Sequence, residues 1–380
     1  MEYKEYELGE LLYYKQPTPY IVESTDYNDA CETPVLTAGK SFILGYTDEK
    51  EGIYDQLPVI IFDDFTTASQ YVNFKFKVKS SAMKILTPVT ELVLPKYIYY
   101  RMQIINFDHS THKRYWIQQY SKIRVSVPPL PEQERIVSRI EELFSQLDAG
   151  VETLKKTKAE IVLYRQAVFS SVIGKYDGVS KKLSDIAVTV DGDRGKNYPK
   201  KAELTQTGDC LFLTAANVKP YGWSFEDNTF ISKEKDGILH GGRLQKNDVV
   251  ITTRGTLGNV AIYDESVPFD TVRINSCMLI IRVTDESVSP YYLAQYLMSP
   301  MFKYQIAKLK SGTAQPQIPA NILREISLKI PSSNDQNAII GELTGKFSVC
   351  DSIEQTVDTA LQQAEAMRQS ILKDAFEGRL

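Results

Sequence analysis

Three motifs in the sequence could carry chemistry, and each is incomplete. Residues 37–41 (TAGKS) resemble the end of a phosphate-binding loop, but Pro34 stands where the leading glycine is required, which favours a turn. Asp63 and Asp64 end an apolar run and could hold a metal ion, yet no acidic or lysine partner follows at nuclease-like spacing. The single Pro-Pro, at 128–129, is not the Asn/Asp-Pro-Pro-aromatic motif expected of an amino-methyltransferase. We therefore expect no catalytic centre.

Metal-binding patterns are also missing from the sequence. The four cysteines lie tens of residues apart and form no Cys-x-x-Cys pair. His109 and His112 are close in sequence, but no cysteine or acidic cluster accompanies them. We expect neither a bound metal nor a cofactor.

Basic and aromatic residues are concentrated in one stretch that could bind a polyanion. Residues 2–64 contain 4 Lys/Arg and 14 Asp/Glu, whereas residues 65–124 contain 10 Lys/Arg, 2 Asp/Glu and many aromatic residues. Positive charges contact phosphates, and aromatic rings can meet sugars and bases. The alternative is that the two stretches neutralise each other within one domain and that the aromatic residues form its core.

Individual candidates for DNA contacts lie in loops and on one strand. Lys75 and Lys77 alternate, so they would share one strand face, which could equally be a solvated face. Arg254 could grip a guanine through two hydrogen bonds, or it could be a loop arginine in a salt bridge. Loop glutamines could read adenine or simply be solvated. The candidates are Lys75, Lys77, Lys113, Arg114, Tyr115, Arg194, Lys196, Thr253, Arg254, Thr256, Gln315 and Gln317.

An internal repeat predicts the elements that position these residues. Shifting the chain by 203 residues aligns 128–169 with 331–372 without a gap and with nine identities. Within the aligned segments apolar residues recur at alternating steps of four and three, which is the coiled-coil period. The pattern predicts two long helices, over 131–176 and 331–380, that pair through the seam positions Phe144, Leu147, Leu154, Lys158, Phe347, Glu354, Val357 and Leu361.

Charged residues in the repeat predict how the helices pair. If the helices run antiparallel about the middle of the seam, Lys158 and Glu354 fall close together and could fix the register. The matched Arg165 and Arg368 are interpreted as lying at the flank of the helices or contacting a partner protein.

Each predicted helix follows a globule with strand-like runs. Residues 1–130 and 177–330 contain short β-branched runs such as LPVIIF (57–62) and DVVITT (248–253). Pro58–Phe62 resembles Asn247–Ile251, a weak echo between the globules. The predicted fold class is α+β: two globular α/β domains separated by two long coiled-coil helices, with a pseudo-two-fold internal repeat.

Length and composition agree with this organisation. A chain of 380 residues exceeds what one core usually supports, and its composition of 43% hydrophobic and 24% charged residues is ordinary for a globular protein. No apolar run approaches the roughly 20 residues of a membrane-spanning helix, and the acidic N-terminus does not resemble a secretory signal. We expect a cytoplasmic protein with no membrane partner.

Several motifs resemble those of the specificity subunits of type I restriction–modification systems. They are PPLPEQERIVSRIEELFSQLD (128–148) with YRQAVF (164–169), TTRGTLGNVAIY (252–263), SGTAQPQIPANIL (311–323) and the C-terminal MRQSILKDAFEGRL. The resemblance covers essentially the whole chain. The second helix departs from the usual Pro-x-x-Glu-Gln opening, with SSNDQ at 332–336.

The resemblance implies a function. Each globule would be a target recognition domain that reads one half of a bipartite, asymmetric double-stranded DNA sequence. The two long coiled-coil helices would pack antiparallel, set the spacing and dock two methylation subunits. Motor–nuclease restriction subunits would complete the enzyme. The chain itself would be non-catalytic, because S-adenosylmethionine, ATP and magnesium would belong to the partner subunits. The alternatives are a coiled-coil scaffold or adaptor, and a silent specificity cassette without an active partner enzyme.

Overall fold

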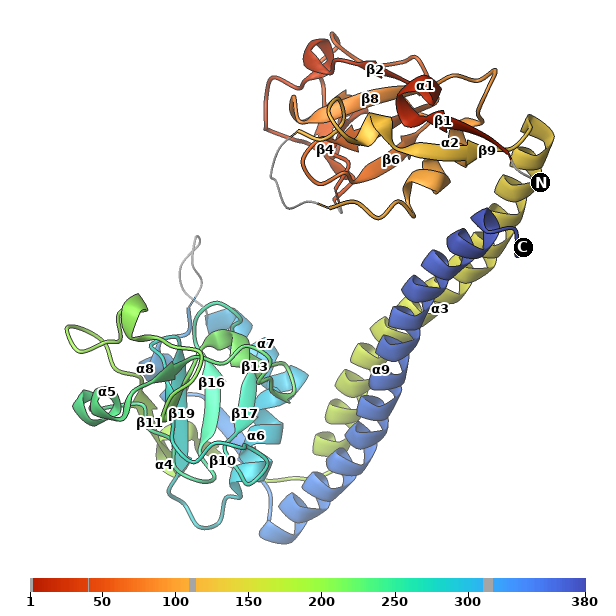
Figure 1. Cartoon of the computed structure of the whole chain (residues 1–380). Coiled ribbons are helices and arrows are strands. Elements are labelled where there is room, and N and C mark those ends of the chain that lie inside the picture. Colours follow the sequence, from red (N-terminus) through yellow and green to blue (C-terminus); the bar gives the residue numbers. More distant parts are fainter. Residues whose placement is uncertain (1–2, 40, 109–113, 310–316) are drawn as a thin grey trace. The chain divides into compact units, whose positions relative to one another are not determined.

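The computed structural model describes residues 3–39, 41–108, 114–309 and 317–380. The chain divides into two compact units, and each is described by itself. Unit 1 comprises residues 1–155 and 358–380, and unit 2 comprises residues 156–357. Two long helices, α3 (Leu130–Gly174) and α9 (Ser333–Phe376), each contribute to both units (Figure 1).

The globule of unit 1 is built from two small sheets. A four-stranded antiparallel sheet has the order β2-β8-β5-β6, and a three-stranded sheet has the order β4-β3-β7 with β3 and β7 parallel. A third pair, β1 with β9, brings the first strand beside the last. The elements are β1 (Lys4–Glu7), α1 (Leu8–Leu11), β2 (Leu12–Lys15), β3 (Thr33–Leu36), β4 (Ile43–Thr47), β5 (Val59–Asp63), β6 (Ser69–Val72), β7 (Lys77–Val78), β8 (Met83–Pro88), α2 (Pro95–Met102) and β9 (Arg124–Val127).

The globule of unit 2 repeats this plan with additional short elements. Its four-stranded sheet has the order β11-β19-β16-β17, its three-stranded sheet the order β15-β12-β18 with β12 and β18 parallel, and β10 pairs with β20. The elements are β10 (Val179–Lys182), α4 (Leu183–Ile186), β11 (Ala187–Asp191), β12 (Cys210–Leu213), β13 (Val218–Lys219), β14 (Gly222–Trp223), β15 (Phe230–Ile231), α5 (Lys233–Ile238), β16 (Val249–Thr252), β17 (Val260–Ile262), β18 (Val272–Ile274), β19 (Met278–Val283), α6 (Pro290–Met298), α7 (Pro300–Leu309), α8 (Ala320–Arg324) and β20 (Ser327–Ile330).

Central strands of both globules are buried on both faces, which explains their near-continuous apolar sequences. In β5, Val59 to Phe62 are fully buried, and all of β16 is buried in the same way. The echo between 58–62 and 247–251 therefore marks equivalent strands. The internally repeated α+β organisation predicted from the sequence is confirmed.

A buried glutamine ties the start of each long helix to its globule. In unit 1, Gln133 Nε2 donates to the carbonyls of Leu92 (3.0 Å) and Pro128 (2.8 Å), and its Oε1 accepts from the Leu94 amide (2.8 Å). In unit 2, Gln336, 203 positions later, makes the same three bonds at 2.8–2.9 Å with Ser287, Pro331 and Ser289. The partners are backbone groups beside each helix start, and the two glutamines are 0% and 1% exposed. The glutamines therefore fix the start of each long helix to its globule by hydrogen bonds.

All eight predicted seam residues are buried or half-buried. Phe144, Phe347 and Val357 are buried, and the other five are half-buried.

Helix α3 begins one residue before the predicted start, because Pro129 O accepts from the amides of Glu132 and Gln133.

Candidate nucleic-acid interface

A tight turn follows β16 in the second globule and presents Arg254. The preceding residue, Thr253, is buried, and both its amide and its hydroxyl donate to Cys277 O, at 2.8 and 3.1 Å. Ile318 N donates to Thr253 O at 3.1 Å, which brings Gln317 beside Arg254 as an isolated antiparallel bridge. The exposed Arg254 then donates from Nε to Gln317 Oε1 at 3.0 Å. We call these two residues the second-globule pair.

The first globule has the same arrangement at the end of the equivalent strand, β5. Asp64 N donates to Ala82 O at 3.0 Å, as Thr253 does to Cys277, and Tyr115 N donates to Asp64 O at 2.9 Å. Ala82 and Cys277 each directly precede the paired strand, β8 or β19. These bonds make Phe65 the counterpart of Arg254, and Arg114 the counterpart of Gln317.

Phe65 and Arg114 therefore form the first-globule pair. The Phe65 side chain is 44% exposed, and the Arg114 guanidinium carbon lies 5.9 Å from its ring centroid. Arg114 is itself exposed. The same backbone framework thus presents an arginine on an aromatic ring in one globule and an arginine hydrogen-bonded to a glutamine in the other.

The structure corrects three of the candidate DNA contacts. Lys77 is 4% exposed and forms an ion pair with Glu49 at 2.7 Å, so it does not share an exposed face with Lys75. Tyr115 is a core residue that packs edge-to-face on Phe107. Thr253 is buried, as described above. Each of these side chains is committed to an internal partner and cannot meet DNA from this position.

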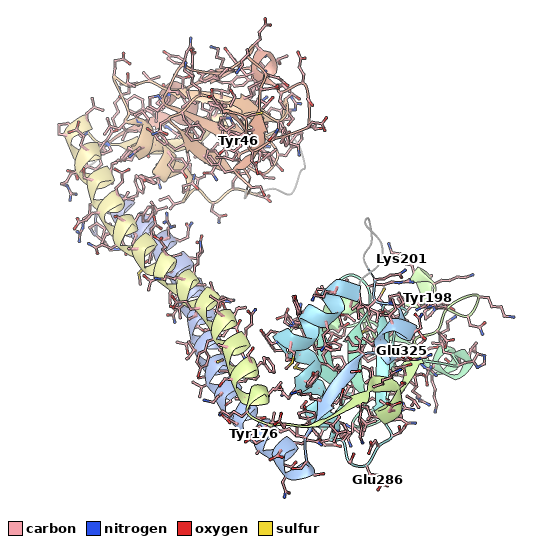
Figure 2. The ribbon with its side chains drawn as sticks, turned by 180° about the vertical axis from the view of Figure 1, so that it is seen from behind. Tyr46, Tyr176, Tyr198, Lys201, Glu286 and Glu325 are labelled. Atoms are coloured by element: carbon pink, nitrogen blue, oxygen red, sulfur yellow. The ribbon has the colours of Figure 1, made fainter. Side chains whose placement is uncertain are left out.

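The other described candidates are accessible to different degrees. Lys75, Lys196, Thr256 and Arg194 are exposed, although Arg194 lies 3.3 Å from Asp191 and shares its charge with that carboxylate. Gln317 is half-buried. The segment that carries Arg194 and Lys196 leads to Tyr198 and Lys201, which lie in unit 2 at the end opposite Tyr176 and Glu286 (Figure 2). Lys113 and Gln315 lie outside the described residues.

Phe65 was missed from the sequence. The echo of 58–62 with 247–251, continued by three residues, aligns Phe65 with Arg254. That alignment was the signal that could have found it. Arg114 and Gln317 are related by the 203-residue shift of the repeat, continued back from 128 and 331. The sequence does not show that they meet Phe65 and Arg254, which lie 49 and 63 residues earlier in the chain.

Arg165 is buried in unit 2 and is not a flanking residue as expected. Its side chain is 3% exposed, and Nη2 lies 2.5 Å from Asp351 Oδ1 and 3.4 Å from Glu354 Oε2. Its guanidinium carbon lies 5.0 Å from the ring centroid of Tyr221 and 5.4 Å from that of Phe347. Arg165 is thus a basic neighbour of Glu354. That Lys158 also lies close to Glu354 and fixes the register of the helices stays a prediction.

Arg368 makes the corresponding contacts in unit 1. It forms an ion pair with Asp148, and its guanidinium carbon lies 4.2 Å from the Phe144 ring centroid. Its side chain is 32% exposed, far more than that of Arg165. The helices therefore repeat an Arg–Asp–Phe cluster, with the buried copy in unit 2.

No group of three or more His, Cys, Asp or Glu side chains in the described segments could hold a metal ion. The described helices include none that is both long and apolar enough to span a bilayer. Asp63, one of the acids considered for metal binding, accepts hydrogen bonds from the Phe65 and Thr66 amides at 2.8 and 3.0 Å, so it caps the strand-end turn.

These features define a class of internally duplicated proteins with two equivalent surface positions that carry different side chains. A family model described as "Type I restriction modification DNA specificity domain" matches residues 1–162 and 177–363. The chain is 31% identical over 379 residues to the specificity subunit of the type I restriction enzyme EcoR124I/EcoR124II from Escherichia coli, with 95% of this chain and 90% of that one covered. It is 24% identical over 404 residues to the MjaVIII specificity subunit from Methanocaldococcus jannaschii, with 98% and 92% covered.

A solved structure shares the fold of the chain. It is described as the structural basis of complex assembly and conformational transition of the type I R-M system, and it matches with a TM-score of 0.70 at 14% identity over 100% of this chain and 98% of that one. The chain belongs to the family of type I restriction–modification specificity subunits.

Proposed function

We propose that this chain supplies DNA sequence specificity to a type I restriction–modification enzyme, and that each globule reads one half of a bipartite, asymmetric target. The observation that carries the proposal is the equivalence of the first-globule and second-globule pairs. A shared backbone framework that presents different side chains suits two half-sites of different sequence. Base-reading side chains confer sequence specificity, whereas phosphate contacts mainly supply affinity and orientation.

The proposed function implies which proteins this chain binds and which of them carry the cofactors. Two methylation subunits would dock on the paired helices, and motor–nuclease restriction subunits would join them. S-adenosylmethionine, ATP and magnesium would be bound by those partners, and this chain would act in the cytoplasm without a catalytic step of its own.

The test is to map DNA methylation with and without the chain. The full-length chain is co-produced with its cognate methylation subunits, and methylated adenines in the host DNA are located by sequencing. The expected result is one bipartite motif with two different halves, which is absent when the chain is omitted. A methylation pattern that does not depend on the chain would contradict the proposal and favour the scaffold or a silent specificity cassette.

A further inference from the structure

We propose that Arg254 reads a guanine in the half-site bound by the second globule, and that Gln317 is the residue that positions it. The inference rests on the proposed function and adds a base identity and a role for each residue. It starts from the hydrogen bond between Arg254 Nε and Gln317 Oε1, which spans 63 residues of sequence.

The backbone that carries Arg254 is held rigidly. Its amide donates to Cys277 O at 3.2 Å, the adjacent Thr253 is fixed by two further bonds to the same carbonyl, and Ile318 N bonds to Thr253 O. The turn continues through Gly255 and Gly258, whose φ angles of +74° and +77° lie in the left-handed region. At Gly258 a Cβ would also lie 2.5 Å from Ile306 Cδ1, so a larger residue would strain the backbone and displace the end of the Ile306 side chain on α7.

The bond to Gln317 selects which edge of the guanidinium is free. With Nε engaged, the planar group is held in one orientation, and its Nη1 and Nη2 donors remain for a ligand. Within the described segments, the Arg254 guanidinium forms no ion pair with an acidic side chain. The arginine is therefore both oriented and uncommitted at its outer end.

Two parallel donors match one base edge in the major groove. Guanine presents the acceptors N7 and O6 side by side, whereas adenine places a donor, N6, where guanine has O6. A phosphate would also accept these donors, but contact with a phosphate does not require a fixed guanidinium plane. The orientation by Gln317 thus favours a base edge. The first-globule pair differs, since Phe65 at the position of Arg254 has no donor.

The test uses the full chain assembled with its methylation subunits and synthetic duplexes that carry the motif found for the wild-type complex. Each base pair of the two half-sites is replaced in turn, and methylation rates are compared. The wild-type complex is expected to require a guanine in the second half-site. In Arg254→Lys the charge is kept but the fork is lost, so preference for that guanine over adenine should fall by roughly 5- to 150-fold.

Gln317 is tested by a matched pair of substitutions. Gln317→Met keeps the size but removes the acceptor, so the guanine preference should weaken. Gln317→Glu keeps an acceptor for Nε, so the preference should be retained even if the added charge lowers the rate on every duplex. Discrimination in the first half-site should remain unchanged in all variants, which shows that each complex is folded.

Several outcomes would overturn the inference. A second half-site without guanine would do so while leaving the proposed function intact, and so would undiminished guanine preference in Arg254→Lys, which would place Arg254 on a phosphate or away from DNA. Equal preference in Gln317→Met and wild type would remove the positioning role. Failure to find any bipartite motif would instead count against the proposed function.

Discussion

Arg165 and Asp351 form an ion pair between the two long helices, and the repeat contains a second such pair in which the helices exchange roles. Arg165 lies on α3 and pairs with Asp351 on α9 at 2.5 Å, whereas Arg368 lies on α9 and pairs with Asp148 on α3. Each arginine also faces the phenylalanine four residues before its acid, Phe347 or Phe144. The sequence repeat is therefore reproduced as a repeat of specific contacts.

The two arginines should differ in their contribution to stability. Because Arg165 is nearly fully buried against two aromatic rings, Arg165→Ala should lower the free energy of unfolding by about 2–4 kcal/mol. Arg368→Ala should cost about 1 kcal/mol, since water already screens its ion pair. Urea unfolding of both variants measures the difference, and equal losses would contradict it.

The buried glutamines should be equally sensitive to loss of their amides. Gln133→Leu and Gln336→Leu each leave three backbone groups without a partner, so each should lower the free energy of unfolding by about 2–4 kcal/mol. Gln362→Leu, on an exposed part of α9, is the control and should change it by less than about 0.5 kcal/mol. Thermal and urea unfolding measure these changes. An unchanged free energy of unfolding in Gln336→Leu would show that the three hydrogen bonds of Gln336 do not stabilise the fold.

Lys75 and Lys77 provide a matched pair for testing electrostatic contacts with DNA. If exposed Lys75 contacts a phosphate, Lys75→Gln should reduce the slope of log affinity against log salt by about 0.9. Lys77→Gln removes the buried partner of Glu49, so it should lower the melting temperature and leave the slope unchanged. Binding of duplex DNA by the assembled complex, measured from low to physiological salt, distinguishes the two. A smaller slope in Lys77→Gln alone would reverse the assignment.

Phe65 should affect only one half of the target. In Phe65→Ala the ring beside Arg114 is lost, and the first half-site should become less strictly recognised while the second is unaffected. Methylation sequencing of the variant complex gives both answers at once. A loss of recognition confined to the half-site that the Arg254 variants affect would contradict the assignment of Phe65 to the other half of the target.

Acid stability should depend on Asp285 in a defined pH range. Hydrogen bonds from Lys181 and Ser287 lower its pKa from 3.8 to about 2. A depressed carboxyl pKa contributes stability above the unfolded value, and this contribution is lost as pH falls from about 4 to about 2. Asp285→Asn should therefore be less stable than the wild type at neutral pH, and the gap should close by about pH 2. Melting temperatures across this range check it, and a constant gap would exclude the carboxylate as its source.

Periodicity and self-similarity predicted the helices and the duplication because both are local or repeated properties of the sequence. The burial of Lys77 could not be predicted from periodicity or self-similarity. Its side chain turns inward to meet Glu49, which lies 28 residues earlier, and β7 is only two residues long, so alternation has little meaning there. The pairing of Phe65 with Arg114 likewise depends on a bond between Asp64 and Tyr115 that only the folded backbone creates.

The exchanged ion pairs bear on how such a chain could arise. The first repeat alone contains the arginine, the aspartate and the phenylalanine of the cluster, as Arg165, Asp148 and Phe144, and these do not contact one another. Two identical copies of residues 1–176 would bring Arg165 of each onto Asp148 of the other. The product of an ancestral gene of half the length could thus have bound a palindromic DNA site as a homodimer. Duplication and fusion of that gene would then have allowed the two halves to diverge and to recognise different DNA sequences.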